Sequence, residues 1–171
     1  MSDKHQHTIS VLVENNAGVL ARIAGLFTGR GYNIDSLTVS PTDNSGLSKM
    51  TIVTTGNDEV LEQIEKQLSR LIEVLKITDL TGSSFIEREL LLVKVKGTQE
   101  NRSEIMQITE VFKGKIVNVH VNEITVELSG RSAKIDAFLK LMESFGIIEI
   151  VRTGRVATSR TPGSTQELQQ I

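Results

Sequence analysis

Two kinds of hydrophobic pattern alternate along the first half of the chain. Apolar residues alternate with polar ones over residues 8–14, which predicts a strand with one buried face. Over residues 19–27 the apolar residues are instead spaced three and four apart, which predicts a helix. This helix is expected to end at Gly29 or Gly31, because glycine readily adopts the left-handed conformation common just after a helix.

The pattern then returns to strands and a second helix. Residues 33–40 predict a strand, and a turn-rich segment separates it from another strand over residues 47–55. Asn57 or Asp58 can cap the next helix, and residues 71–80 lead into a further strand. The order βαββαβ predicts a ferredoxin-like α+β domain, in which two helices cover one face of an antiparallel sheet.

The second half of the chain repeats this order with different residues. Strands are expected over residues 90–95, 116–121, 124–128 and 147–151, with helices after the first and third of them. We therefore predict two ferredoxin-like domains in tandem, over residues 8–80 and 86–155, and a flexible tail over residues 156–171.

Charge and composition narrow the functional classes. The chain has 171 residues, with 19 Lys and Arg against 21 Asp and Glu. This balance argues against a nucleic-acid partner, which would need an excess of positive charge. No apolar run reaches the roughly 18 residues of a membrane span, so no membrane association is expected. The lack of cysteine favours a cytoplasmic location.

Few side chains offer catalytic or metal-binding chemistry. His5 and His7 could bind a metal together, but the sequence shows no third ligand near them, so no metal site is predicted. His120 has no partner at a recognisable catalytic spacing, and no nucleotide-binding or nucleophile motif occurs. No catalytic residue is therefore assigned.

The segment between the first strand and the first helix is the remaining candidate. It reads Glu14-Asn-Asn-Ala-Gly-Val-Leu20 and places two amide side chains and a glycine at a helix N-terminus, where a carboxylate could bind. Alternatively, Asn15 or Asn16 caps its own helix and Gly18 is only a turn residue.

Longer stretches of the chain resemble a known family. HTISVLVENNAGVLARIAGLFTGRGYNIDSLTVSPTD, at residues 7–43, resembles the ACT domain of the small regulatory subunits of acetolactate synthase. LSKMTIVTTG at residues 47–56 and IERELLLVKV at residues 86–95 extend the resemblance into the second domain.

The resemblance implies a regulatory subunit without an active site of its own. Such a subunit activates a large catalytic subunit that carries thiamine diphosphate, Mg²⁺ and FAD, and it confers feedback inhibition by valine in branched-chain amino-acid biosynthesis. No cofactor is then expected in this chain. An alternative is a stand-alone ACT-type amino-acid sensor that controls another enzyme or transcription.

In the family, the effector binds between two ACT domains of a homodimer. The contacts carried over to this sequence are Asn15, Gly18, Leu20, Asn33 and Ile34. Asn33 and Ile34 are expected to open the second strand, at a sheet edge that pairs with a second copy. The corresponding segment of the second domain, Gly97-Thr-Gln99, lacks the Asn-x-x-Gly pattern, so no equivalent site is expected there.

Overall fold

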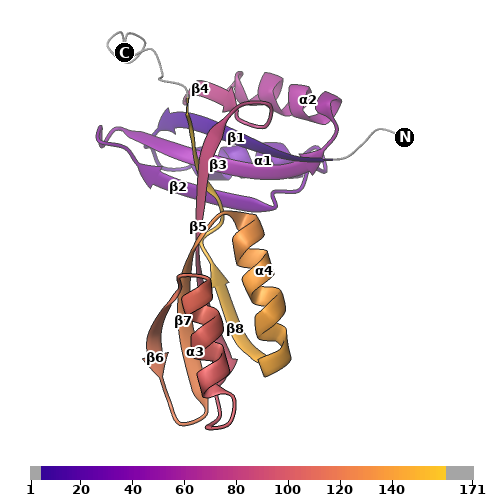
Figure 1. The fold of residues 1–171 in the computed structure, drawn as a ribbon. Helices are drawn as coiled ribbons and strands as arrows, with labels where there is room; N and C mark the ends of the chain where they lie inside the picture. The colour runs from indigo at the N-terminus through magenta and orange to yellow at the C-terminus, as the bar shows by residue number, and fades with distance from the viewer. Residues whose placement is uncertain (1–4, 161–171) are drawn as a thin grey trace. The chain divides into compact units, whose positions relative to one another are not determined.

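The computed structural model describes residues 5–160, which divide into two compact units. One unit runs up to residue 86 and takes in the chain from residue 155 onward, and the other comprises residues 87–154. In each unit, two helices lie against a sheet (Figure 1). Among residues 5–160, no helix is both long and apolar enough to cross a membrane.

The first unit has the predicted βαββαβ order. Its sheet is antiparallel with the strand order β2-β3-β1-β4, so that β2 and β4 form the edges. The elements are β1 (His5–Glu14), α1 (Val19–Thr28), β2 (Ser36–Pro41), β3 (Leu47–Gly56), α2 (Asp58–Leu68) and β4 (Val74–Asp79).

A single apolar layer joins the helices of the first unit to its sheet. The alternating residues Ile9, Val11 and Val13 of β1 are fully buried against the apolar stripes of α1 and α2. Each such side chain contributes about 1.5–3 kcal/mol when removed from water. The largest fully buried helix residues in this core are Ile23, Phe27, Ile64 and Leu68.

The second unit repeats the arrangement, which confirms the predicted α+β fold with two ferredoxin-like units. Its strands follow the order β6-β7-β5-β8, and α3 and α4 cover one face of the sheet (Figure 1). The elements are β5 (Phe85–Lys96), α3 (Arg102–Val111), β6 (Lys115–Val119), β7 (Glu123–Gly130), α4 (Ser132–Met142), a short 3₁₀ helix (Glu143–Phe145) and β8 (Ile147–Arg152).

The chain after the second unit differs from the predicted tail. Residues Val156–Ser159 form a further strand, β9, where the sequence predicts the start of a flexible segment. Contacts with the first unit order it: the backbone N–H of Ala157 donates to Thr51 Oγ1 at 3.3 Å, and the Arg155 guanidinium donates to Thr8 Oγ1 at 2.6 Å. The rest of the predicted tail, residues 161–171, lies outside the described residues.

Candidate functional site

The N-terminus of α1 opens onto free space at Gly18. Gly18 occupies the N-cap position with φ of 88°, a left-handed conformation that favours glycine. Within residues 5–160, no side chain caps this helix, and apart from Gly18 and its two chain neighbours no residue has a heavy atom within 4 Å of a Cβ built at Gly18. The first-turn N–H groups, where the positive end of the helix dipole lies, therefore have room for an anion.

The two asparagines before Gly18 do not cap the helix. Asn15 Nδ2 donates instead to the Ser45 carbonyl at 2.9 Å, and Asn16 Nδ2 donates to the Glu14 carboxylate at 2.8 Å. The alternative in which Asn15 or Asn16 caps α1 is therefore wrong. Within the described part of the chain, Asn15 Oδ1 accepts no hydrogen bond, so it can accept one from an ammonium group.

Two further side chains define the surroundings of the α1 N-terminus. Leu20, in the first turn, is 42% exposed and offers an apolar surface beside Gly18. Arg22, one turn along the helix, forms an ion pair with Glu73, which neutralises the nearest positive side chain of α1. The attraction for an anion at this position therefore comes from the helix terminus itself.

Asn33 and Ile34 lie in the loop between α1 and β2. The prediction that they open the second strand is wrong, because β2 begins at Ser36. Local polar contacts hold the loop in place of a strand ladder: Asn33 Nδ2 donates to Asp35 Oδ1 at 2.7 Å, and the Thr54 hydroxyl donates to the Asn33 carbonyl at 2.7 Å. Ile34 is half-buried and packs against the core of the first unit.

The predicted site residues fall into two groups at opposite ends of α1. Asn15, Gly18 and Leu20 lie at its start, whereas Asn33 and Ile34 follow its end. A helix of 10 residues is about 15 Å long at 1.5 Å per residue. One chain therefore does not bring the two groups together around a ligand as small as an amino acid.

The corresponding junction in the second unit has a different structure. Arg102 begins α3, and its Nη2 donates to the carbonyls of Gly97, His120 and Val121 at 3.3, 3.0 and 2.8 Å. A guanidinium thus ties this loop to a neighbouring turn, and the N-cap of α3 is Asn101, whereas the N-cap of α1 is the open Gly18. The expectation that the second unit has no equivalent effector site remains a prediction.

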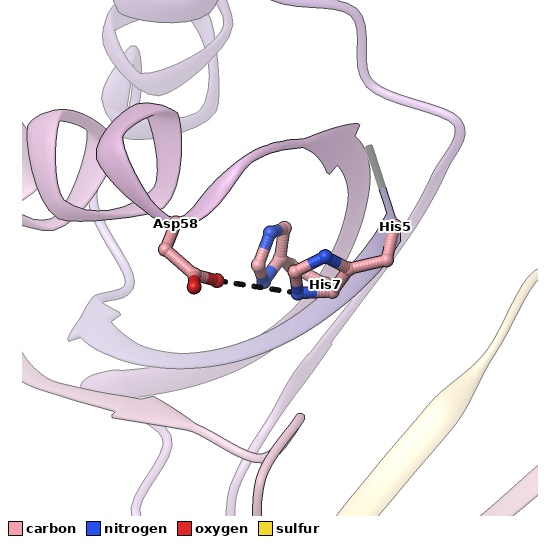
Figure 2. Close-up of side chains that lie close together, drawn as sticks. All are labelled: His5, His7 and Asp58. Atoms are coloured by element: carbon pink, nitrogen blue, oxygen red, sulfur yellow. Dashed lines mark ion pairs between the residues drawn. The ribbon is translucent and has the colours of Figure 1, made fainter. Parts of the chain in front are cut away.

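A further cluster of potential ligands was missed from the sequence. His5, His7 and Asp58 converge at the start of β1, and one possible ligand atom from each lies within 4.8 Å of the others (Figure 2). The statement that the histidines have no third ligand nearby is therefore wrong. The third ligand is Asp58, and the pairing of β1 with β3 brings it close, because His5 lies opposite Gly56, two residues before Asp58.

Comparisons with known proteins match both units. Residues 9–76 match the family described as the AHAS small subunit-like ACT domain, and residues 88–161 match the family described as the small subunit of acetolactate synthase. The two matches together span most of the chain.

Individual relatives align along nearly their whole length. A probable acetolactate synthase small subunit of Methanothermobacter thermautotrophicus is 52% identical over 155 residues, covering 90% of this chain and 92% of the relative. The isozyme 3 small subunit of Escherichia coli is 48% identical over 153 residues, covering 89% and 94%. The crystal structure of the small subunit from Thermotoga maritima superposes with a TM-score of 0.83 at 41% identity, covering 91% and 98%.

Proposed function

Because this chain belongs to the family of acetolactate synthase small subunits, we propose that it binds valine at a site shared by two copies of its ACT domain. Members of this family are regulatory, and catalysis resides on the large subunit. The proposal extends this to a cytoplasmic complex in which valine binding inhibits a partner that carries thiamine diphosphate, Mg²⁺ and FAD. Residues 8–80 would bind the effector, and residues 86–155 would support the assembly.

The open helix terminus at Gly18 is the observation that carries the proposal. An amino-acid carboxylate fits the first-turn N–H groups of α1, since a Cβ is absent and no side chain occupies this position within residues 5–160. The Asn15 amide oxygen lies in the same junction and can accept from the ammonium group. Leu20 can cover the aliphatic side chain of the ligand.

The separation of the two residue groups favours a site made by two copies. β2 is an edge strand, so its free side can pair with the β2 of a second copy. Antiparallel pairing across a two-fold axis brings the end of α1 in one copy toward the start of α1 in the other. Asn33 and Ile34 of the second copy would then complete the contacts made by Gly18 and Leu20.

The expected affinity suits a metabolite sensor. Burial of the valine side chain contributes about 1.5–3 kcal/mol, and each charged hydrogen bond contributes about 1.5–3 kcal/mol. Because association costs at least several kcal/mol, we expect a dissociation constant of about 1 μM to 1 mM. Inhibition further requires that valine bind one state of the complex more tightly than another.

Reconstitution tests the function. Addition of this chain to the purified large subunit is expected to raise the rate of acetolactate formation, and valine is expected to lower it again. Rates are measured with and without the chain across a valine titration. Failure to raise the rate would contradict the regulatory role, whereas activation without valine sensitivity would contradict the effector assignment alone.

Complementation between two defective variants tests whether the site is shared. Asn33→Ala and Gly18→Asp are each expected to weaken valine binding, because each removes one half of the site. A mixed dimer places the intact Gly18 of one copy beside the intact Asn33 of the other, so a 1:1 mixture is expected to recover about a quarter of the sites. Calorimetric titration counts these sites, and a mixture that recovers none would show that each site lies within one chain.

A further inference from the structure

His5, His7 and Asp58 are brought together by two neighbouring segments of the first unit. His5 and His7 are two residues apart on β1, so their side chains lie on the same face of the sheet. Asp58 is the first residue of α2, which follows directly after β3, the strand paired with β1. Figure 2 shows the Asp58 carboxylate facing the two imidazole rings.

The distances suit a bound metal ion. His5 Nε2 lies 3.3 Å from Asp58 Oδ1, the two imidazole rings have centroids 4.2 Å apart, and the three candidate ligand atoms lie within 4.8 Å of one another. Ligands of a tetrahedral zinc ion sit about 2.0–2.2 Å from the metal, and therefore about 3.5 Å from each other. His5 and Asp58 are exposed, so small side-chain rotations can close the remaining difference.

The buried ring of His7 provides an independent indication of a ligand. His7 is only 1% exposed, and its Nε2 lies 3.3 Å from the Gly56 carbonyl. That contact requires a proton on Nε2, which leaves the lone pair on Nδ1. Within residues 5–160, Nδ1 has no hydrogen-bond partner. Metal-binding histidines commonly show this arrangement, with one nitrogen donating to a carbonyl and the other free for the metal.

The local charge also favours a cation. Besides Asp58, the carboxyl group of Glu65 on α2 lies near enough to His7 to interact with it electrostatically. Burial raises the pKa of Glu65, the carboxylates of Asp79 and Glu62 raise it further, and His7 lowers it. A cation bound at His7 would therefore lie near the carboxyl group of Glu65 as well as that of Asp58.

We propose that His5, His7 and Asp58 bind a divalent transition-metal ion of the zinc type. Two imidazoles and one carboxylate are ligands that Zn²⁺ prefers, and the exposure of His5 and Asp58 leaves access for the ion and for a water as the fourth ligand. The ion links the start of β1 to the start of α2. Its role is structural, and it is independent of the valine site.

Titration of the full-length chain with ZnCl₂ tests this site. Calorimetry is expected to show one Zn²⁺ per chain, and Co²⁺ is expected to give the visible absorption of a tetrahedral complex. His5→Gln and Asp58→Asn change exposed side chains and leave the core intact. Each is expected to lower the zinc affinity at least about 100-fold, since even the hydrogen-bond partners of metal ligands change it by about 10- to 100-fold.

Two matched variants and a second ion serve as controls. Asp43→Asn and His120→Gln make the same chemical changes at exposed positions outside the cluster and are expected to leave zinc binding unchanged. Mg²⁺ prefers oxygen ligands, so an equal concentration of it is expected not to displace Zn²⁺. A dissociation constant for Zn²⁺ weaker than about 1 mM, equal affinity in the two cluster variants, or displacement by Mg²⁺ would each overturn the proposal.

Discussion

Replacement of Gly18 by Asp is expected to abolish valine inhibition while activation of the large subunit survives. The new carboxylate would stand where we place the valine carboxylate, so repulsion between like charges and loss of space would both oppose binding. The added Cβ meets no steric clash with the surrounding structure, because within residues 5–160 no heavy atom outside Gly18 and its two chain neighbours lies within 4 Å of it. Acetolactate formation is measured across a valine titration of the reconstituted complex.

Gly18→Asn provides the matched control for this variant. Asparagine has the same shape as aspartate and tolerates the left-handed backbone at least as well, so both variants carry a similar cost from the φ of 88°. The neutral variant is expected to retain more valine sensitivity than the charged one. Full valine sensitivity in Gly18→Asp would contradict the placement of the valine carboxylate at the start of α1. Equal loss of sensitivity in both variants would show that the added side chain, and not its charge, opposes valine binding.

Replacement of Arg152 by Met is expected to destabilise the second unit strongly. Glu89 is only 5% exposed, and Arg152 donates to both of its carboxylate oxygens at 2.6 and 2.8 Å. Hydrogen bonds to Glu89 and to Asp136 raise the pKa of Arg152 above its ordinary value. Loss of the guanidinium leaves a buried carboxylate without its cation, which costs about 3 kcal/mol.

Hydrogen exchange of the β5 and β7 amides measures this loss within the second unit. Lys94→Met is the control, because its ion pair with Glu149 at 3.0 Å lies at the surface and is worth about 0–1 kcal/mol. The double variant Arg152→Met with Glu89→Met is expected to recover much of the stability, since it removes both charges. Equal protection in Arg152→Met and Lys94→Met would contradict the importance of this buried pair.

Short-range signals in the sequence predicted most of the fold. The helix α1 ends at Thr28, with Gly29 at the C-cap and Gly31 in a left-handed conformation. The sequence predicts this end because the effect of glycine on a helix is local. Asn57 caps α2 through its own side chain, which accepts from the Val60 N–H at 3.0 Å. These features depend on residues a few positions apart, so periodicity and capping rules are sufficient to find them.

Features that depend on distant contacts were not predicted. The strand β9 lacks a strong pattern and depends on partners far earlier in the chain, since it pairs with β5 and the Ala157 N–H donates to Thr51 Oγ1. Asn33 lies outside β2, and its carbonyl accepts a hydrogen bond from the Thr54 hydroxyl instead of from a backbone N–H of a strand ladder. Asp58 joins His5 and His7 only through the register of β1 against β3. Each case needs the tertiary structure, which a local pattern does not contain.

A crystal structure of the full chain grown with saturating valine tests the central claim most directly. We expect the valine carboxylate at the first-turn N–H groups beside Gly18, with its ammonium near Asn15 of the same chain and Asn33 of a second copy paired through β2. Valine bound entirely within one chain, or absent from the start of α1 in a dimer paired through β2, would contradict the account.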